Sequence, residues 1–410
     1  MPPVSPLAPA AFPAVPAVAG VRLASGAAGA RYRDRDDLLL VGLAPGTTVA
    51  GALTRSRMSS APVDWCRVAL AGGAARALVV NAGNANAFTG AAGGRAVRRT
   101  AEAAARLVGA RPGEVFVAST GVIGEPLDEA RIVARLPELS AALAPTGWEA
   151  AARAIMTTDT FPKGATRTAT IAGSPVTLAG IAKGSGMIAP NMATMLAFVF
   201  TDATLPAGIL QRLVTAAVNR SFNCITIDGD TSTSDTVLAF ASGAGAAHAA
   251  VSHAGDRRLK GFAEALTALM VDLARQVVCD GEGAEKLMTV TVSGAASPNA
   301  ARRIGLAIAG SPLVKTAIAG ADANWGRIVM AVGKSGEKAD RDRLAIRIGG
   351  LPVAENGVRY PGLDEAALAP HMAGREIRIE VDVGVGRGRA TVWGCDLTHG
   401  YIDINAAYRS

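Results

Sequence analysis

Residues 183–196 read KGSGMIAPNMATML, from Lys183 to Leu196. This Gly- and Pro-containing stretch runs directly into an apolar segment that ends at Phe200 and is typical of a buried strand. A small residue, then Thr194, then a buried strand is the arrangement of a chain that cleaves itself before a threonine. The stretch therefore indicates a cut between Ala193 and Thr194, although a Gly-rich loop with an incidental threonine is the commoner arrangement.

Cleavage before Thr194 would supply a nucleophile together with its own base. A free threonine hydroxyl scarcely ionises at neutral pH, whereas an α-amino group has a reference pKa of roughly 7.7–8.0 and is partly neutral there. That amine can accept the hydroxyl proton, so such a site needs no histidine.

Composition indicates a compact globular protein and excludes several classes. The chain has 410 residues, of which 50% are apolar and 18% charged, enough for two or more core-forming units. No apolar run reaches the roughly 18 residues that span a bilayer, so no membrane partner is expected. The net charge of +7, with only 4% aromatic residues, does not demand a nucleic-acid partner.

The N-terminal residues and the metal-ligating residue types add two expectations. Residues 1–20 contain six prolines and no basic region, which favours a flexible leader over a signal peptide and a cytoplasmic protein. The four cysteines form no CxxC pair and the four histidines show no ligand spacing. We therefore expect neither a disulfide nor a metal site.

Strand and helix patterns are mixed along the chain, which indicates an α/β or α+β protein. The expected helices are 94–107, 148–156, 205–218 and 258–279. The expected strands lie on both sides of the Pro45-Gly46 turn within 38–55 and at 74–81, 115–118, 169–182, 195–201 and 223–227. Residues 377–383 and 390–393 are expected to form a half-exposed hairpin.

Two segments combine hydroxyl groups with strand or helix ends. Residues 118–124 (ASTGVIG) end a predicted strand in a turn, where a hydroxyl and a backbone N–H could stabilise a negatively charged oxygen. An ordinary Thr-Gly turn is the alternative. Residues 156–163 (MTTDTFPK) could bind a polar substrate group or cap the preceding helix.

Charged residues flanked by glycine mark two more positions. Lys183 precedes Gly184 and could meet a carboxylate in a cleft, or could be a solvated loop lysine. Glu282 stands between Gly281 and Gly283 after a long predicted helix, where it could bind a cationic amine, although Gly281 could simply cap the helix. The C-terminal residues 401–410 (YIDINAAYRS) would ordinarily be frayed.

These stretches, with Thr201-Asp202-Ala203, resemble in order the ornithine acetyltransferase family of arginine biosynthesis (ArgJ type), from about Gly20 to Ser410. The resemblance implies a mixed α/β (α+β) fold of layered sheets between helices, DmpA/ArgJ-like and of the N-terminal nucleophile type. It implies an α chain of residues 21–193 and a β chain of residues 194–410, assembled as a heterotetramer.

The resemblance also implies an activity and its residues. The acetyl group of N2-acetylornithine would pass to glutamate through an acetyl-threonine, without a cofactor, and acetyl-CoA stays open as a second donor. Thr194 would be the nucleophile, and Thr120 and Gly121 would bind the oxyanion. The substrate-binding residues would be Thr157, Lys183, Thr194, Glu282, Asn405 and Ser410.

Two other functions remain open on the sequence alone. An N-terminal-nucleophile amidohydrolase or aminopeptidase of related fold would share the cleavage but pass the acyl group to water. An uncleaved scaffold in an oligomer would perform no acyl transfer. The stretches 228–236 (DGDTSTSDT) and 311–327 match the family without clear chemical roles, and we interpret both as mainly structural, with active-site walls as the alternative.

Overall fold

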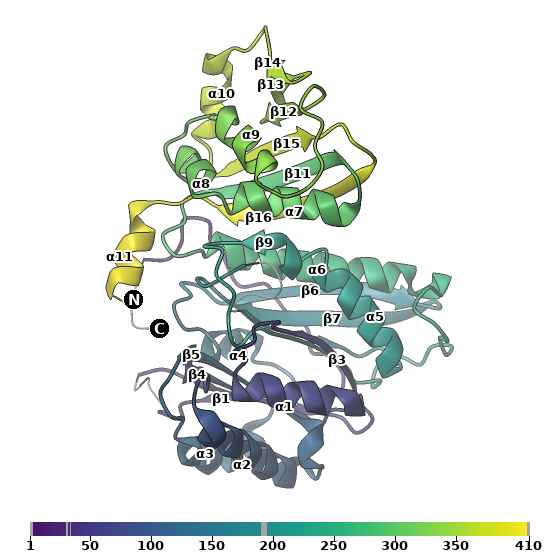
Figure 1. The fold of residues 1–410 in the computed structure, drawn as a ribbon. Helices are drawn as coiled ribbons and strands as arrows, with labels where there is room; N and C mark the ends of the chain where they lie inside the picture. The colour runs from purple at the N-terminus through teal and green to yellow at the C-terminus, as the bar shows by residue number, and fades with distance from the viewer. Residues whose placement is uncertain (1–2, 30–31, 33, 190–194, 408–410) are drawn as a thin grey trace.

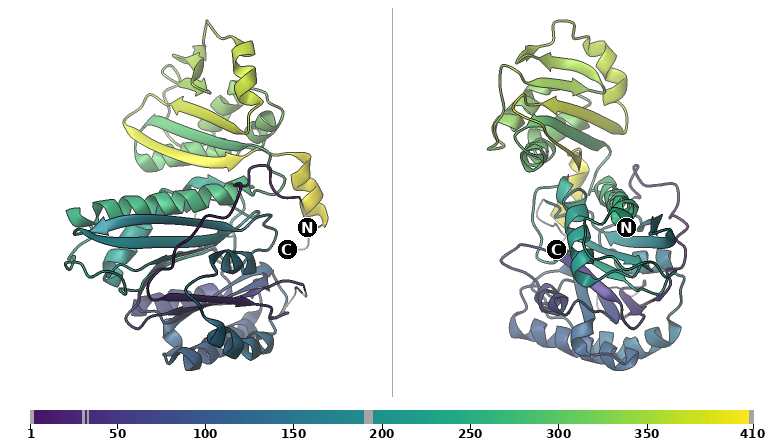
Figure 2. Two further views of the ribbon diagram at one scale, coloured as in Figure 1. Left: turned by 180° about the vertical axis from the view of Figure 1, so that it is seen from behind. Right: turned by 90° about the vertical axis from the view of Figure 1, so that its right-hand side faces the viewer.

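The computed structural model describes residues 3–29, 32, 34–189 and 195–407, which form a mixed α/β protein with three sheets (Figure 1). Two sheets lie face to face with helices on their outer sides, and the third sheet forms a further layer at the other end of the molecule (Figures 1 and 2). The layered, mixed α/β fold expected from the sequence is therefore confirmed.

The first sheet has the strand order β1-β2-β4-β5. Its central strands β2 and β4 are almost entirely buried because both faces of the sheet are covered. On β2, Leu38 and Leu40 pack among residues of helices α2 and α3, whereas Leu39 and Val41 pack toward the second sheet. The elements are β1 (Val21–Gly26), β2 (Leu38–Leu43), α1 (Ala61–Ala69), β4 (Ala77–Asn84), α2 (Gly90–Val108), β5 (Val115–Val122), α3 (Glu129–Ala142) and α4 (Trp148–Ala154).

The second sheet has the strand order β3-β10-β8-β7-β6, and helices α5 and α6 cover its outer face. Aromatic rings join it to the first sheet: Phe116 on β5 meets Phe240 on β10 edge to face, with ring centroids 6.0 Å apart. The elements are β3 (Thr48–Leu53), β6 (Lys163–Ile171), β7 (Ser174–Lys183), β8 (Leu196–Thr201), α5 (Ala207–Val218), β10 (Thr236–Ala241) and α6 (Lys260–Cys279).

The third sheet has the order β14-β13-β12-β15-β11-β16-β9, with α7 packed against β11 and β16. The terminal helix α11 leaves this layer and reaches back toward the other two sheets (Figure 1). The elements are β9 (Ile225–Thr226), β11 (Leu287–Ala295), α7 (Pro298–Ala309), α8 (Pro312–Ala319), α9 (Trp325–Gly333), β12 (Ala345–Ile348), β13 (Leu351–Glu355), β14 (Val358–Arg359), α10 (Glu365–Met372), β15 (Glu376–Asp382), β16 (Gly388–Cys395) and α11 (His399–Ala407).

Two of the strand predictions were wrong. The single strand expected over 169–182 covers the end of β6, a turn and most of β7, because Ala172 and Gly173 take φ of 51° and 88° and reverse the chain. The expected hairpin near the C-terminus does not pair with itself, because β11 lies between β15 and β16. The alternation of buried and exposed residues on β15 is nevertheless present.

Both strands that lead to the Asn- and Thr-containing motifs end later than expected. β4 spans Ala77–Asn84 instead of 74–81, and β5 continues through Val122 instead of ending at Ala118. The two strands are parallel neighbours, so their polar ends emerge together at one edge of the sheet.

The Pro/Ala-rich segment expected to be a flexible leader is described from residue 3 and lies along the body of the molecule. The Ser5 hydroxyl donates to the carbonyl of Cys279 at 2.6 Å, and Phe12 packs over Gly164. Val18 is buried in the core between the first two sheets. Among the described residues, no helix is long and apolar enough to cross a membrane.

Candidate active site

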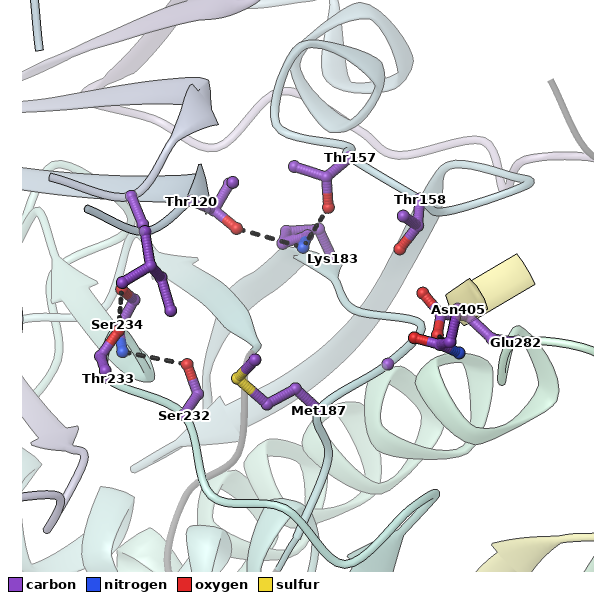
Figure 3. A pocket seen from close by; sticks show the side chains of 14 residues that line it. Thr120, Thr157, Thr158, Lys183, Met187, Ser232, Thr233, Ser234, Glu282 and Asn405 are labelled. Atoms are coloured by element: carbon purple, nitrogen blue, oxygen red, sulfur yellow. Dashed lines mark hydrogen bonds between the residues drawn. The ribbon is translucent and has the colours of Figure 1, made fainter. Parts of the chain in front are cut away.

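A pocket lies where the ends of β5 and β7 meet the loops after α4 and α6 and the terminal helix α11 (Figure 3). Most of its walls are small, hydroxyl-bearing or charged residues drawn from widely separated parts of the chain. Its lining consists of Ala85, Thr120, Gly121, Ile123, Thr157, Thr158, Lys183, Gly186, Met187, Ser232, Thr233, Ser234, Glu282 and Asn405.

The structure brings together every described residue that the sequence marked as a site residue. These are Thr120, Gly121, Thr157, Lys183, Glu282 and Asn405. Ala193, Thr194 and Ser410 lie outside the described residues. The shared location is a finding of the structure, whereas the role expected for each residue stays a prediction.

Lys183 is the central cation of the pocket and is only 2% exposed. Its Nζ donates to the Thr157 hydroxyl at 2.7 Å and to the Thr120 hydroxyl at 3.2 Å (Figure 3). The carboxylate of Asp159 lies 3.7 Å from the same Nζ. Burial lowers the pKa of Lys183, and the charge of Asp159 opposes this shift.

A buried ion triad, formed by Lys163, Asp159 and Asp280, contacts Lys183 through Asp159. Lys163 has no exposed side-chain surface and lies 2.7 Å from Asp159 and 2.5 Å from Asp280. Burial opposes ionisation of Asp159, but Lys163 and Lys183 outweigh it and hold the pKa of Asp159 below its usual value. The pKa of Lys163 is raised, because its two carboxylate partners outweigh the effect of burial.

The triad also fixes the backbone of the segments that carry the pocket residues. Asp159 accepts the N–H groups of Thr157 and Gly184, at 3.0 and 2.6 Å. The carbonyl of Asp280 accepts the Ser185 hydroxyl at 2.8 Å. The loop after α4, the end of β7 and the loop after α6 are thus held in one arrangement.

Gly121 occupies a position that no larger residue can take. Its φ of 129° lies in the region that favours glycine, and an added Cβ would lie 2.3 Å from the carbonyl carbon of Gly83 on the neighbouring strand. The close approach of β4 and β5 at this point sets Thr120 and Gly121 at the pocket wall.

Glu282 provides the negative charge of the pocket. Its Oε2 accepts a 2.8 Å hydrogen bond from Nδ2 of Asn405 on α11. A Cβ on Gly186 would lie 2.4 Å from the same oxygen, so glycine at 186 gives the carboxylate its space. The Thr398 hydroxyl donates to the carbonyl of Gly283 at 2.6 Å and anchors the start of α11 beside this loop.

The stretch 228–236 contributes more to the pocket than the sequence interpretation assigned to it. Ser232, Thr233 and Ser234 line the pocket opposite Lys183, which is the position that the alternative of an active-site wall requires (Figure 3). The sequence signal that could have indicated this was the density of hydroxyl-bearing residues in 228–236. The stretch 311–327 instead forms α8 and the start of α9 beside the third sheet.

The arrangement suits chemistry on a small charged molecule. A buried ammonium and a carboxylate of opposite sign line one cavity together with hydroxyl groups, so a substrate with both an anionic and a cationic end can be held. A hydroxyl and a backbone N–H lie beside one another at Thr120 and Gly121, and groups of these two kinds can stabilise an oxyanion. Among the described residues, no group of three or more His, Cys, Asp or Glu could hold a metal ion.

Comparison with known proteins assigns the family. The sequence profile of the ArgJ family matches residues 22–410. An arginine biosynthesis bifunctional protein ArgJ from Rhizobium meliloti is 58% identical over 409 residues, which cover 99% of each chain. The chain therefore belongs to the ArgJ family, and the enzyme class that the resemblance implied, an acetyltransferase of arginine biosynthesis, is confirmed.

Two solved structures are similar to parts of the chain. The crystal structure of an arginine biosynthesis bifunctional protein ArgJ from Bacillus halodurans is 41% identical, with a TM-score of 0.48, and the match covers 50% of this chain and 96% of that one. The structure of ornithine acetyltransferase with ornithine from Mycobacterium tuberculosis is 35% identical, with a TM-score of 0.38, and covers 42% of this chain and 93% of that one.

Proposed function

We propose that this enzyme moves the acetyl group of N2-acetylornithine to glutamate through an acetyl-Thr194 intermediate, after it has cleaved itself between Ala193 and Thr194. The α chain would be residues 21–193 and the β chain residues 194–410. The observation that carries the substrate assignment is the pairing of Lys183 and Glu282 in one pocket. Both substrates are charged amino acids, and each needs charges of opposite sign around it.

The proposed reaction has two half-steps. The neutral α-amino group of Thr194 takes the proton from its own hydroxyl, and Oγ attacks the acetyl carbonyl carbon. The bond from that carbon to the substrate nitrogen breaks, the nitrogen takes the proton, and ornithine leaves. The amine of glutamate then attacks the acetyl-threonine ester and regenerates the hydroxyl. Such double displacement is the usual signature of a covalent nucleophile.

An acyl-acceptor experiment tests this function. Purified enzyme is given N2-acetylornithine labelled in the acetyl group, with and without glutamate. Labelled N-acetylglutamate that forms only when glutamate is present supports the transferase. Free acetate at the same rate without glutamate would favour the amidohydrolase or aminopeptidase, and no reaction at all would favour the scaffold. Labelled acetyl-CoA in place of acetylornithine decides whether it is a second donor.

We also propose the assembly and compartment that the resemblance implied. Two α and two β chains would form a heterotetramer in the cytoplasm, with small molecules as the binding partners. Size-exclusion chromatography with light scattering gives the mass of the assembly. A mass close to one cut chain would exclude the heterotetramer.

Replacing Thr120 with alanine is expected to lower kcat by roughly 10²–10³-fold, the usual loss when one oxyanion donor is removed. The Thr120 hydroxyl already accepts a hydrogen bond from Lys183, so its own hydrogen is available to donate toward the pocket. Steady-state kinetics with saturating N2-acetylornithine measure the loss. Thr120→Ser, which keeps the hydroxyl, should stay within about tenfold of the wild type; equal losses in both variants would contradict the oxyanion role.

Replacing Glu282 with glutamine is expected to raise KM for N2-acetylornithine by roughly 10–100-fold, because hydrogen bonds to a charged group contribute about 1.5–3 kcal/mol. The kcat value should change little, since this carboxylate binds the amino-acid end and not the reacting carbonyl. Glu285, three residues further on and exposed, gives the matched control Glu285→Gln. An unchanged KM in Glu282→Gln would remove Glu282 from the substrate site.

A further inference from the structure

The stretch 228–236 has contacts that substrate binding does not explain. It runs beside Ile188 on one side and Met195 on the other, the parts of the chain that lead into and out of residues 190–194. Backbone hydrogen bonds join the two ends of the stretch to these parts of the chain. The N–H of Ile227, directly before the stretch, donates to the carbonyl of Ile188 at 2.9 Å, and the N–H of Thr236 donates to the carbonyl of Met195 at 3.1 Å.

Asp228 holds the incoming side with both oxygens of its carboxylate. Oδ2 accepts the N–H of Met187 at 2.5 Å, and Oδ1 accepts the N–H of Ile188 at 2.8 Å. Tyr401 on α11 lies at hydrogen-bonding distance, with its hydroxyl 3.5 Å from Oδ2. Met187 takes a φ of 57°, an unusual value for a residue with a side chain, and the two bonds from Asp228 support it there.

Asp235 holds the outgoing side with one oxygen. Oδ1 accepts the N–H of Met195 at 3.1 Å, and this nitrogen is bonded covalently to the carbonyl carbon of Thr194. The side chain of Asp235 is fully buried, and its Oδ2 has no hydrogen-bond partner among the described residues. Burial raises the pKa of Asp235 well above its usual value.

We propose that Asp228 and Asp235 are positioning residues for the self-cleavage, and that they fix the chain on both sides of the bond between Ala193 and Thr194. The inference rests on the proposed function, because it presupposes that this bond is cut. In the cleavage, Oγ of Thr194 attacks the carbonyl carbon of Ala193, the C–N bond breaks, and the hydroxyl proton passes to the released amine. Water then hydrolyses the ester, which leaves a carboxylate on Ala193 and a free hydroxyl on Thr194.

The two residues should respond differently to the same substitution. Asp228 uses both oxygens as acceptors, so asparagine would place an NH₂ group against a backbone N–H and lose one bond. Asp235 uses one oxygen as an acceptor, so asparagine can reproduce that acceptor in the same place. Alanine at 235 removes the acceptor altogether. Misplacing a reacting group by about 1 Å can slow a reaction roughly 10²-fold.

The test is a time course of cleavage in the full chain. Wild type and variants are made by cell-free translation with a labelled amino acid, and the fragments ending at Ala193 and beginning at Thr194 are followed by mass spectrometry. We expect Asp228→Asn and Asp235→Ala to cleave roughly 10–100-fold more slowly than wild type, and Asp235→Asn to stay within about threefold. Asp230→Asn, an exposed aspartate of the same stretch, is the matched control and should cleave at the wild-type rate.

The outcomes separate the inference from the function on which it rests. If wild type is cut and Asp228→Asn and Asp235→Ala are cut equally fast, the positioning role is wrong and the proposed function stands. If Asp235→Asn is as slow as Asp235→Ala, the acceptor that asparagine keeps is not what matters, and the positioning role of Asp235 is wrong. If wild type stays intact, self-cleavage itself fails. Thermal melting separates misfolding from slow cleavage, since a folded but uncut variant keeps the Tm of the uncut Thr194→Ala chain.

Discussion

Replacing Thr194 with alanine is expected to abolish acetyl transfer and to leave the chain in one piece. The variant lacks the hydroxyl that would carry the acetyl group. An uncut chain would also have no α-amino group at residue 194 to accept a proton. Loss of a covalent nucleophile lowers kcat by about 10⁶-fold in well-measured hydrolases, and we expect a loss of this order here.

The loss is measured as labelled N-acetylglutamate formed from labelled N2-acetylornithine. Thr194→Ser is the matched control, because serine keeps a hydroxyl nucleophile and, once cut, an α-amino base. It should retain measurable cleavage and transfer. Turnover by Thr194→Ala above roughly one-hundredth of the wild-type rate would exclude Thr194 as the nucleophile, whatever the state of the chain.

Replacing Lys163 with alanine is expected to lower the free energy of unfolding by about 3–5 kcal/mol, the usual cost of breaking a buried ion pair. Lys163 lies between Asp159 and Asp280 with no side-chain exposure. Without it, two carboxylates remain close together in a buried place with too little positive charge nearby. The Asp159 carboxylate also holds the backbone of Thr157 and Gly184, so the pocket should lose its shape as well.

Denaturant unfolding measures this change. The matched control is Arg167→Ala, which breaks a partly exposed pair with Asp272 and should cost about 0–1 kcal/mol. A loss below roughly 1 kcal/mol in Lys163→Ala would mean that the triad contributes no more than a surface pair. The raised pKa of Lys163 means that the wild-type triad contributes stability at neutral pH and loses it as the pH rises through that pKa. Lys163→Ala has no ammonium at this position and should lack this alkaline loss of stability.

Local patterns predicted the elements that depend on neighbouring residues. The strands on either side of Pro45-Gly46 and the long helix α6 lie close to where the sequence indicated, because turn residues and apolar periodicity are local signals. The pairing of strands is not local. Nothing in residues 377–393 reveals that β11, almost a hundred residues earlier, would lie between β15 and β16.

The site residues also divide into those that local sequence signals marked and those that only the folded chain brings together. Residue types and flanking glycines marked Thr120, Lys183 and Glu282 individually, and the family resemblance implied that they belong to one active site. The triad could not be predicted, because Asp280 meets Lys163 across 117 positions of sequence. Asn405 sits at the end of the chain, and only the position of α11 brings it to Glu282.

The intact mass of the purified wild-type protein tests the central claim most directly. We predict two chains, one ending at Ala193 and one beginning at Thr194, which together exceed the mass of the precursor by one water. The two-chain result with a free threonine α-amino group establishes the base that the mechanism needs. A single chain of full length in an active preparation would contradict the account, because Thr194 would then have no amine to accept its proton.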